Sequence, residues 1–273
     1  MRILIMLLFA AVATTVSAQY YYNDIITTRQ TNKQYKLLKD NNIQSVTARS
    51  FEADGSLSEG FSLTQQLSEG STVITTTSEH TGTDKAISVS YYNNNRIRKT
   101  VDSVPNIKST TTYTYNNNDL TSITTLTEDV FMNNSSVETH QWFYENNIPV
   151  KMLLIKNNID TITVMFNKDS SGNITEEYWI KKGRRVETYL YYYNENNNLT
   201  DIVRFNLKAG RLLPDFTFEY DNKGTITQFM QVPQGSADYL VWQYIYNPNG
   251  LKQKELCFTK NQQPVGRIEY AYK

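Results

Sequence analysis

The chain has 273 residues with 27 basic and 27 acidic side chains, so it carries no net charge at neutral pH. This balance gives no general attraction for nucleic acid or for an anionic membrane, so we expect no nucleic-acid partner and no stable membrane insertion. With 20 Tyr, 11 Phe, many Thr and Asn but only 11 Gly, the composition favours pleated strands joined by Asn-rich turns, which indicates an all-β protein.

The first 18 residues predict a signal peptide. Arg2 precedes an apolar run at 3–13, which is shorter than the roughly 20 residues of a membrane-spanning helix. Residues 16–18 (Val-Ser-Ala) fit a small-residue cleavage site, so the mature chain is expected to begin at Gln19. We therefore expect a secreted or periplasmic protein, and the Ser-Ala-Gln sequence at 17–19 suits a Gram-negative bacterium as its source. An uncleaved N-terminal anchor is the alternative.

Residues 19–85 are expected to form an N-terminal, β-rich segment with one short helix. Residues 20–22 (Tyr-Tyr-Tyr) predict a first strand or an exposed arm. Residues 30–40 predict the helix, because Tyr35 and Leu38 are spaced to share one side of it. From residue 43 onward β-type residues recur between turn signals, which is typical of consecutive hairpins.

Residues 86–273 contain a repeat. In each copy an aromatic residue ends a strand, an Asn- or Asp-rich turn follows, and Leu or Ile begins the next strand. The last aromatic residues before the turns lie 22 to 29 positions apart and are Tyr92, Tyr115, Tyr144, Phe166, Tyr193, Tyr220, Tyr246 and Tyr272. A period near 26 has room for two strands and two connections. The repeat therefore predicts an antiparallel meander of about 14 strands in a long curved or spiralling sheet.

The aromatic residues of each copy share one face of their strand, because side chains at alternate positions point the same way. One interpretation makes this face the core of the sheet. The other leaves part of it exposed, where flat rings with nearby amides would suit a glycan or a peptide. Under the second interpretation the binding row consists of Phe218, Tyr220, Trp242, Tyr244 and Tyr246.

The repeat resembles the YD repeats of the Rhs and teneurin families, which read Tyr-x-Tyr-Asp-x-x-Gly-Arg-Leu. Residues 218–226 (Phe-Glu-Tyr-Asp-Asn-Lys-Gly-Thr-Ile) are similar, and residues 244–251 are similar with Asn247 in place of Asp. The resemblance implies a spiralling or curved meander of hairpins. It does not carry over the function of Rhs proteins, which enclose a toxin segment in a shell of many more repeats.

Residues that could carry chemistry are few. His80 and His140 lie in Thr- and Glu-rich contexts typical of a surface, and the single Cys257 is expected to be buried beside Leu256. The adjacent acidic pairs are Glu176 with Glu177 and Glu128 with Asp129. Neighbours on a strand face opposite ways, so neither pair makes a two-carboxylate site by itself, and charged surface explains them better. No metal or cofactor is expected.

These observations favour an exported, non-enzymatic β-repeat protein that acts as a binding or structural module at or outside the cell envelope. Its partner would be a glycan, a peptide or a protein at the cell surface. Two alternatives stay open: a carbohydrate-active enzyme that uses a carboxylate pair, and an outer-membrane β-barrel, which would need an apolar lipid-facing surface.

Overall fold

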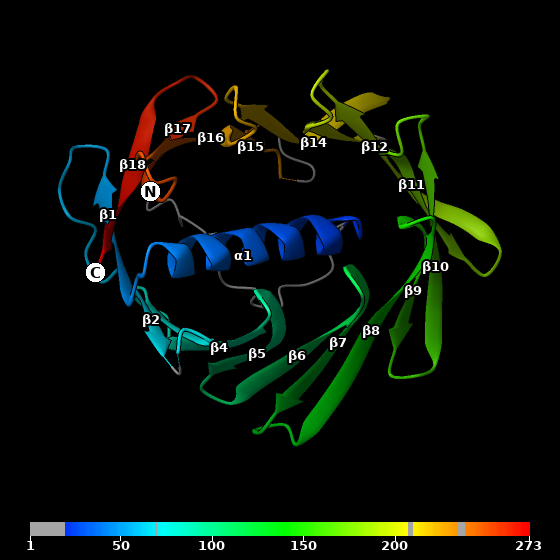
Figure 1. Ribbon diagram of the computed structural model, residues 1–273, viewed down its shortest axis with the longest axis horizontal. Helices are drawn as coiled ribbons and strands as arrows, with labels where there is room; N and C mark the ends of the chain where they lie inside the picture. The colour runs from blue at the N-terminus through cyan, green and yellow to red at the C-terminus, as the bar shows by residue number, and fades with distance from the viewer. Residues whose placement is uncertain (1–19, 69, 207–209, 234–237) are drawn as a thin grey trace.

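The computed structural model describes residues 20–68, 70–206, 210–233 and 238–273, so the predicted signal peptide lies outside the described residues. Within the described part, the chain forms one helix and 18 strands (Figure 1). Their bounds are α1 Asn23–Asp40, β1 Ser45–Glu52, β2 Ser62–Ser68, β3 Val73–Glu79, β4 Ala86–Asn93, β5 Arg96–Val104, β6 Ile107–Asn116, β7 Asp119–Asp129, β8 Asn134–Glu145, β9 Ile148–Lys156, β10 Asp160–Lys168, β11 Ile174–Lys181, β12 Arg184–Tyr193, β13 Leu199–Asn206, β14 Arg211–Tyr220, β15 Ile226–Gln231, β16 Leu240–Tyr246, β17 Lys252–Thr259 and β18 Pro264–Tyr272.

The 18 strands form one closed antiparallel barrel. Each strand pairs with the next in the chain, and β18 returns to β1 with Val46 opposite Tyr272. The predicted antiparallel meander is confirmed, but the expected curved or spiralling sheet did not include closure. Closure leaves neither end of the sheet with unpaired backbone groups, which an open sheet of this length would expose. Strands β1–β3, from the N-terminal segment, complete the ring.

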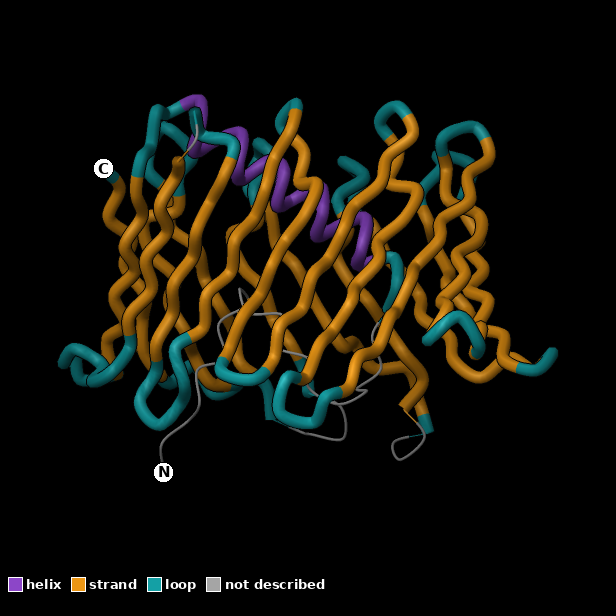
Figure 2. Tube along the Cα trace, turned by 90° about the horizontal axis from the view of Figure 1, so that it is seen from below, coloured by secondary structure: helices purple, strands orange, loops and turns teal. Residues whose placement is uncertain are grey.

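The repeated turns lie together on one rim of the barrel, seen from the side in Figure 2. We call it the Asn-turn rim; it contains the connections 94–95, 117–118, 146–147, 169–173, 194–198, 221–225 and 247–251. Asn94 and Asn95 both have positive φ, of 50° and 60°, as a tight two-residue hairpin turn requires. In a later copy Asp221 accepts hydrogen bonds from the backbone N–H groups of Lys223 and Thr225. The two-residue turn and the longer turn both use Asn or Asp because these residues favour turns.

The repeated tyrosines join each hairpin to the preceding one. The hydroxyl of Tyr220 donates to the carbonyl of Leu199, 2.6 Å away, just after the preceding turn. The same bond recurs in other copies at 2.6–2.8 Å, from Tyr144 to Leu120, Tyr193 to Ile174, Tyr246 to Ile226 and Tyr272 to Lys252. Phe166 has no hydroxyl and cannot make it. The spacing of the motif thus places a hydroxyl beside a carbonyl one hairpin away.

We expect Tyr220→Phe to lower the free energy of unfolding by about 1 kcal/mol, because the change leaves the ring in place but removes one partly buried hydrogen bond. Chemical denaturation measures the loss. Tyr192→Phe is the matched control, because Tyr192 is 47% exposed, and its stability should be unchanged. An unchanged stability in Tyr220→Phe would contradict a role of the repeated hydroxyl in joining the hairpins.

The helix α1 lies inside the barrel, nearer to the Asn-turn rim (Figures 1 and 2). It begins at Asn23, seven residues earlier than predicted, and its buried side chains are Asp24, Ile25, Thr28, Tyr35 and Leu38. Tyr35 stacks on Tyr92 with ring centroids 3.8 Å apart. The helix is longer than its narrow apolar stripe predicted because the barrel wall, far away in sequence, supplies the packing.

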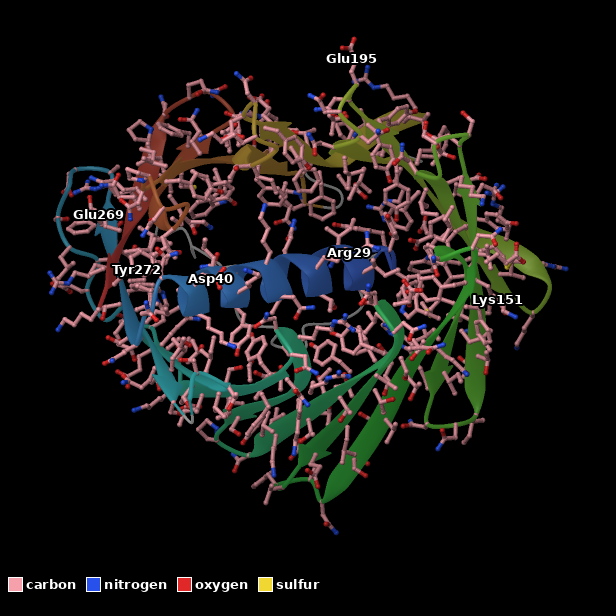
Figure 3. All side chains as sticks on the ribbon, viewed as in Figure 1. Arg29, Asp40, Lys151, Glu195, Glu269 and Tyr272 are labelled. Atoms are coloured by element: carbon pink, nitrogen blue, oxygen red, sulfur yellow. The ribbon has the colours of Figure 1, made fainter. Side chains whose placement is uncertain are left out.

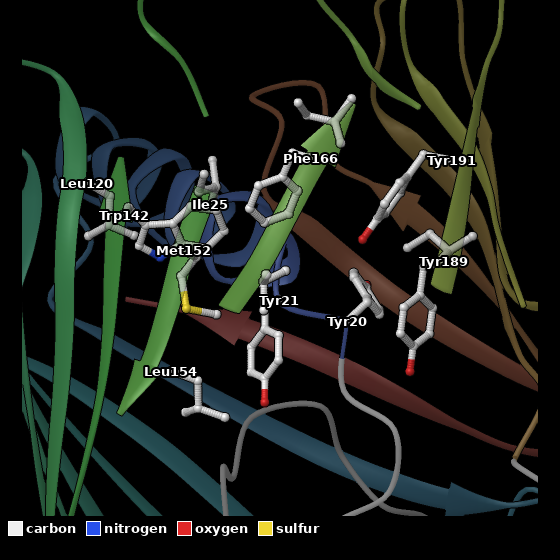
Figure 4. Close-up of a cluster of buried hydrophobic side chains, with 13 residues drawn as sticks. Tyr20, Tyr21, Ile25, Leu120, Trp142, Met152, Leu154, Phe166, Tyr189 and Tyr191 are labelled. Atoms are coloured by element: carbon white, nitrogen blue, oxygen red, sulfur yellow. The ribbon is translucent and has the colours of Figure 1, made fainter. Parts of the chain in front are cut away.

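Tyr20 and Tyr21 are each only 7% exposed and precede α1 in a turn, so the expectation of a strand or an exposed arm was wrong. They belong to the largest buried cluster, shown in Figure 4, together with Trp142, Met152 and Tyr189. The aromatic faces of the strands point inward in this way around the barrel. They are its core, as the first interpretation expected. Cys257 is 1% exposed, as predicted.

Candidate functional site

The N-terminal segment is fixed to the inner wall through a single carboxylate. Glu177 on β11 accepts hydrogen bonds from the backbone N–H groups of Tyr21 and Tyr22, each at 2.8 Å. It also accepts from the indole nitrogen of Trp179 at 2.6 Å and the hydroxyl of Tyr191 at 2.7 Å. Four donors therefore converge on one fully buried side chain.

Burial raises the pKa of the Glu177 carboxyl, while the hydrogen bonds from Trp179, Tyr21 and Tyr191 act in the opposite direction. The prediction of charged surface is wrong for this residue. Its signal was present in the sequence, because Glu177 alternates with Trp179 and so shares the aromatic face of the strand. A carboxylate on an apolar face needs partners, and here two donors come from the wall itself and two from the distant N-terminal segment.

A second buried polar contact fixes the first turn of α1. His140 on β8 is 7% exposed, and its Nδ1 lies 2.6 Å from Asp24 while its Nε2 lies 3.0 Å from Glu138. Both partners are carboxyl groups, and the protonated imidazole can donate from both ring nitrogens to them at once. Burial lowers the pKa of His140, but the charges and hydrogen bonds of Asp24 and Glu138 outweigh this and raise it to about 9. The surface prediction for His140 was wrong, because α1 covers it.

A small cleft lies where the start of α1 meets the wall. Tyr22, Ile26 and Gln30 contribute the helix side, and the wall side comes from Tyr193, Asn197, Asn198, Leu199, Phe218 and Tyr220. Its volume is about 170 Å³. Aromatic rings and side-chain amides thus surround one concavity beside the Asn-turn rim.

The five residues of the predicted aromatic row do not form one surface. Phe218 and Tyr220 line the cleft, whereas Trp242 is 9% exposed and packs in a buried cluster with Phe229 and Cys257, which Phe218 and Tyr244 border. Tyr244 has the ammonium of Lys252 over its ring at 4.3 Å, and Tyr246 donates to the carbonyl of Ile226. The row follows the inner wall, and its β14 members line the cleft. Binding by these residues stays a prediction.

The wall divides the pair of Glu176 and Glu177, as alternation predicted. Glu177 faces the lumen, whereas Glu176 is on the outside with Arg185 as its ion-pair partner. Across the residues described, no cluster of three or more His, Cys, Asp or Glu side chains is arranged to hold a metal. No helix in the described part of the chain is both long enough and apolar enough to cross a membrane.

No protein-family model and no curated protein matches the chain. Among solved structures it is similar to a porin-like protein from Bacteroides uniformis, at 10% identity and a TM-score of 0.39, covering 85% of this chain and 98% of that one. A porin-like protein from Bacteroides vulgatus is similar at 12% identity and a TM-score of 0.29, covering 85% of this chain and 98% of that one. The Tc holotoxin pore from Photorhabdus luminescens is similar at 10% identity and a TM-score of 0.22, covering 86% of this chain but 17% of that one. With TM-scores below 0.5, these likenesses carry no argument about function.

Proposed function

We propose that the chain is an exported, non-enzymatic β-barrel of the cell envelope, with its outer wall in water and its lumen plugged by α1, and that it acts as a binding module. The cleft beside the Asn-turn rim carries this proposal. Tyr22, Phe218 and Tyr220 offer ring faces, and Gln30 and Asn198 offer amides. Rings that pack on an apolar face, with a few amides that fix orientation, suit a sugar residue.

The size of the cleft limits the ligand. Its 170 Å³ is smaller than the roughly 300–1,000 Å³ of pockets for drug-sized molecules. We therefore expect it to hold one terminal sugar ring of a surface glycan, with the remaining sugars outside. A peptide side chain is the other occupant of this size.

We expect Gln30→Ala to weaken glycan binding about fivefold to tenfold, because it removes one amide from the cleft at a cost of about 1 kcal/mol. Gln30 is exposed on α1, so the change keeps the fold. Gln34→Ala, one turn further along the helix and outside the cleft, is the matched control. A glycan array identifies the ligand, and titration calorimetry measures both variants. A folded protein that binds no array member, or equal loss in both variants, would count against the proposal.

The outer wall supports an aqueous setting. On β17 and β18, Lys254 lies 3.0 Å from Glu269, which also lies 2.9 Å from Arg267, and Figure 3 places Glu269 on the outside of the wall. Lys108 and Thr110 are on β6, in a wall of Ser- and Thr-rich strands. A barrel that spans a membrane needs an apolar outer band about 25 Å tall, whereas charged groups here lie along the strands.

The second candidate is an outer-membrane barrel, and two observations favour it. The closed sheet fits this alternative better than it fits an open repeat module, because only closed barrels span membranes with strands. The outer face of strands β12, β13 and β14 also has an apolar row. It consists of Leu190, Val203 and Pro214, which are partners in register. Cell fractionation separates the candidates. Release from membranes by high salt or carbonate fits the water-facing barrel, whereas extraction only by detergent would favour the spanning one.

A further inference from the structure

Exposed apolar side chains are concentrated at the rim opposite the Asn turns. This far rim contains the connections 105–106, 130–133, 157–159, 182–183 and 260–263. At the far-rim end of every hairpin from β5–β6 to β13–β14 stands a large apolar side chain that is 44–87% exposed. We call this set the apolar rim; its members are Ile107, Val130, Phe131, Met132, Ile159, Val186, Phe205 and Leu212.

The exposure of these side chains is not explained by folding. Phe131 is 81% exposed, Met132 69% and Ile159 87%, so they contribute little to the core. Turns ordinarily carry Asn, Asp, Gly and Ser, as the Asn-turn rim of the same barrel does. Scattered single apolar residues on a surface are normal, but a series at one end of the molecule marks an interaction surface.

The arrangement fits a lipid surface better than a protein partner. The apolar side chains stand on separate hairpin ends, with polar residues such as Asn133 and Asn158 between them. A protein partner would need a matching pocket for each of them. The boundary between headgroups and acyl chains accepts each apolar side chain independently, and the polar neighbours stay among the headgroups.

Charge specifies the kind of surface. Exposed Lys108, Lys182, Arg184 and Arg211 lie at the same hairpin ends as the apolar rim. Of the acidic groups there, Asp160 pairs with Lys181 and Asp129 accepts from the backbone N–H of Met132, and Glu128 also lies at the end of β7. Each basic side chain near an anionic surface adds electrostatic attraction to it. We infer that the apolar rim docks the barrel peripherally on a bilayer surface with anionic headgroups, with no strand crossing the bilayer.

A vesicle flotation assay tests this inference with the whole chain as expressed, its N-terminus established by mass spectrometry. The probe is vesicles of phosphatidylethanolamine with phosphatidylglycerol, compared with vesicles of phosphatidylcholine alone. We expect binding to the first, weaker binding to the second, and release by high salt. The double variant F131E/I159E should bind at least about tenfold more weakly, because it replaces two inserting side chains by charges.

Ile245→Glu is the matched control, because Ile245 is 41% exposed on β16 next to the Asn-turn rim, and it should bind as the unchanged chain does. Phe131→Trp adds a fluorescent reporter whose emission should shift to the blue and be quenched by brominated lipid. Failure of the unchanged chain to float, or equal loss in Ile245→Glu, would overturn the inference. So would light scattering that shows a dimer dispersed by F131E/I159E in a protein that binds no vesicles, because the rim would then join two copies.

Discussion

Glu177→Ala should release the N-terminal segment and α1 from the barrel and lower the free energy of unfolding by about 3–6 kcal/mol. The change leaves the N–H groups of Tyr21 and Tyr22, the indole of Trp179 and the hydroxyl of Tyr191 without their acceptor. Each buried donor left unsatisfied costs about 1–3 kcal/mol, and the four are too close together for their costs to add fully. Denaturant titration measures the total.

Release of α1 can be distinguished from global unfolding. Arg29 and Lys33 on α1 are exposed side chains at which trypsin can cut once the helix leaves the lumen. Faster cleavage there, with the β signal in circular dichroism retained, indicates release with an intact barrel. Glu176→Ala is the matched control, because this neighbour faces outward and pairs with Arg185, a contact worth less than about 1 kcal/mol. Equal losses in both variants would contradict the role assigned to Glu177.

The local part of the fold could be predicted because each repeat contains its own signals. Alternating aromatics, the Asn turns and the following Leu or Ile define the hairpins, and 15 strands from Ala86 compare with the predicted 14. Closure could not be predicted from these signals. It depends on the small twist and shear between strands, summed over all 18, and a hairpin motif does not fix that sum.

The placement of α1 is the other feature that the sequence did not reveal. A helix with Arg29, Lys33 and Lys36 exposed on one side has the pattern of a surface helix. Its position inside the barrel depends on Glu177 and His140, which lie more than 100 residues away. In the sequence, Glu177 and His140 are each visible as a charged or polar residue on the inward face of a strand. The partner of each could not be identified from the sequence, because it is brought close only by the closed barrel.

Between pH 6.5 and pH 9, stability should fall by about 3 kcal/mol through His140 alone. Its pKa is raised from an ordinary value near 6.5 to about 9 in the folded protein. A raised pKa means that the folded state holds the proton more tightly, so the added stability is complete below about 6.5 and is lost as pH rises through about 9. The groups that face the imidazole are Asp24 from α1, Glu138 beside it on β8, and the ring of Tyr21, which stands nearly perpendicular to it.

At acid pH, stability should also fall, through Glu138. The hydrogen bond from His140 lowers the pKa of the Glu138 carboxyl to about 2, so the stability that this carboxylate contributes is lost only as pH falls toward that value. Denaturant titrations across pH 6–10 should therefore show a decline that His140→Gln abolishes. His80→Gln is the control that should leave the decline intact, because His80 lies between β3 and β4 and is not a partner of His140. Asp24→Asn should make the decline shallower, because it removes the stronger of the two carboxylate interactions that raise the pKa of His140 and leaves Glu138 beside the ring. A decline that persists in His140→Gln would show that another group senses pH, and the His140–Asp24 contact would then be structural without being charged.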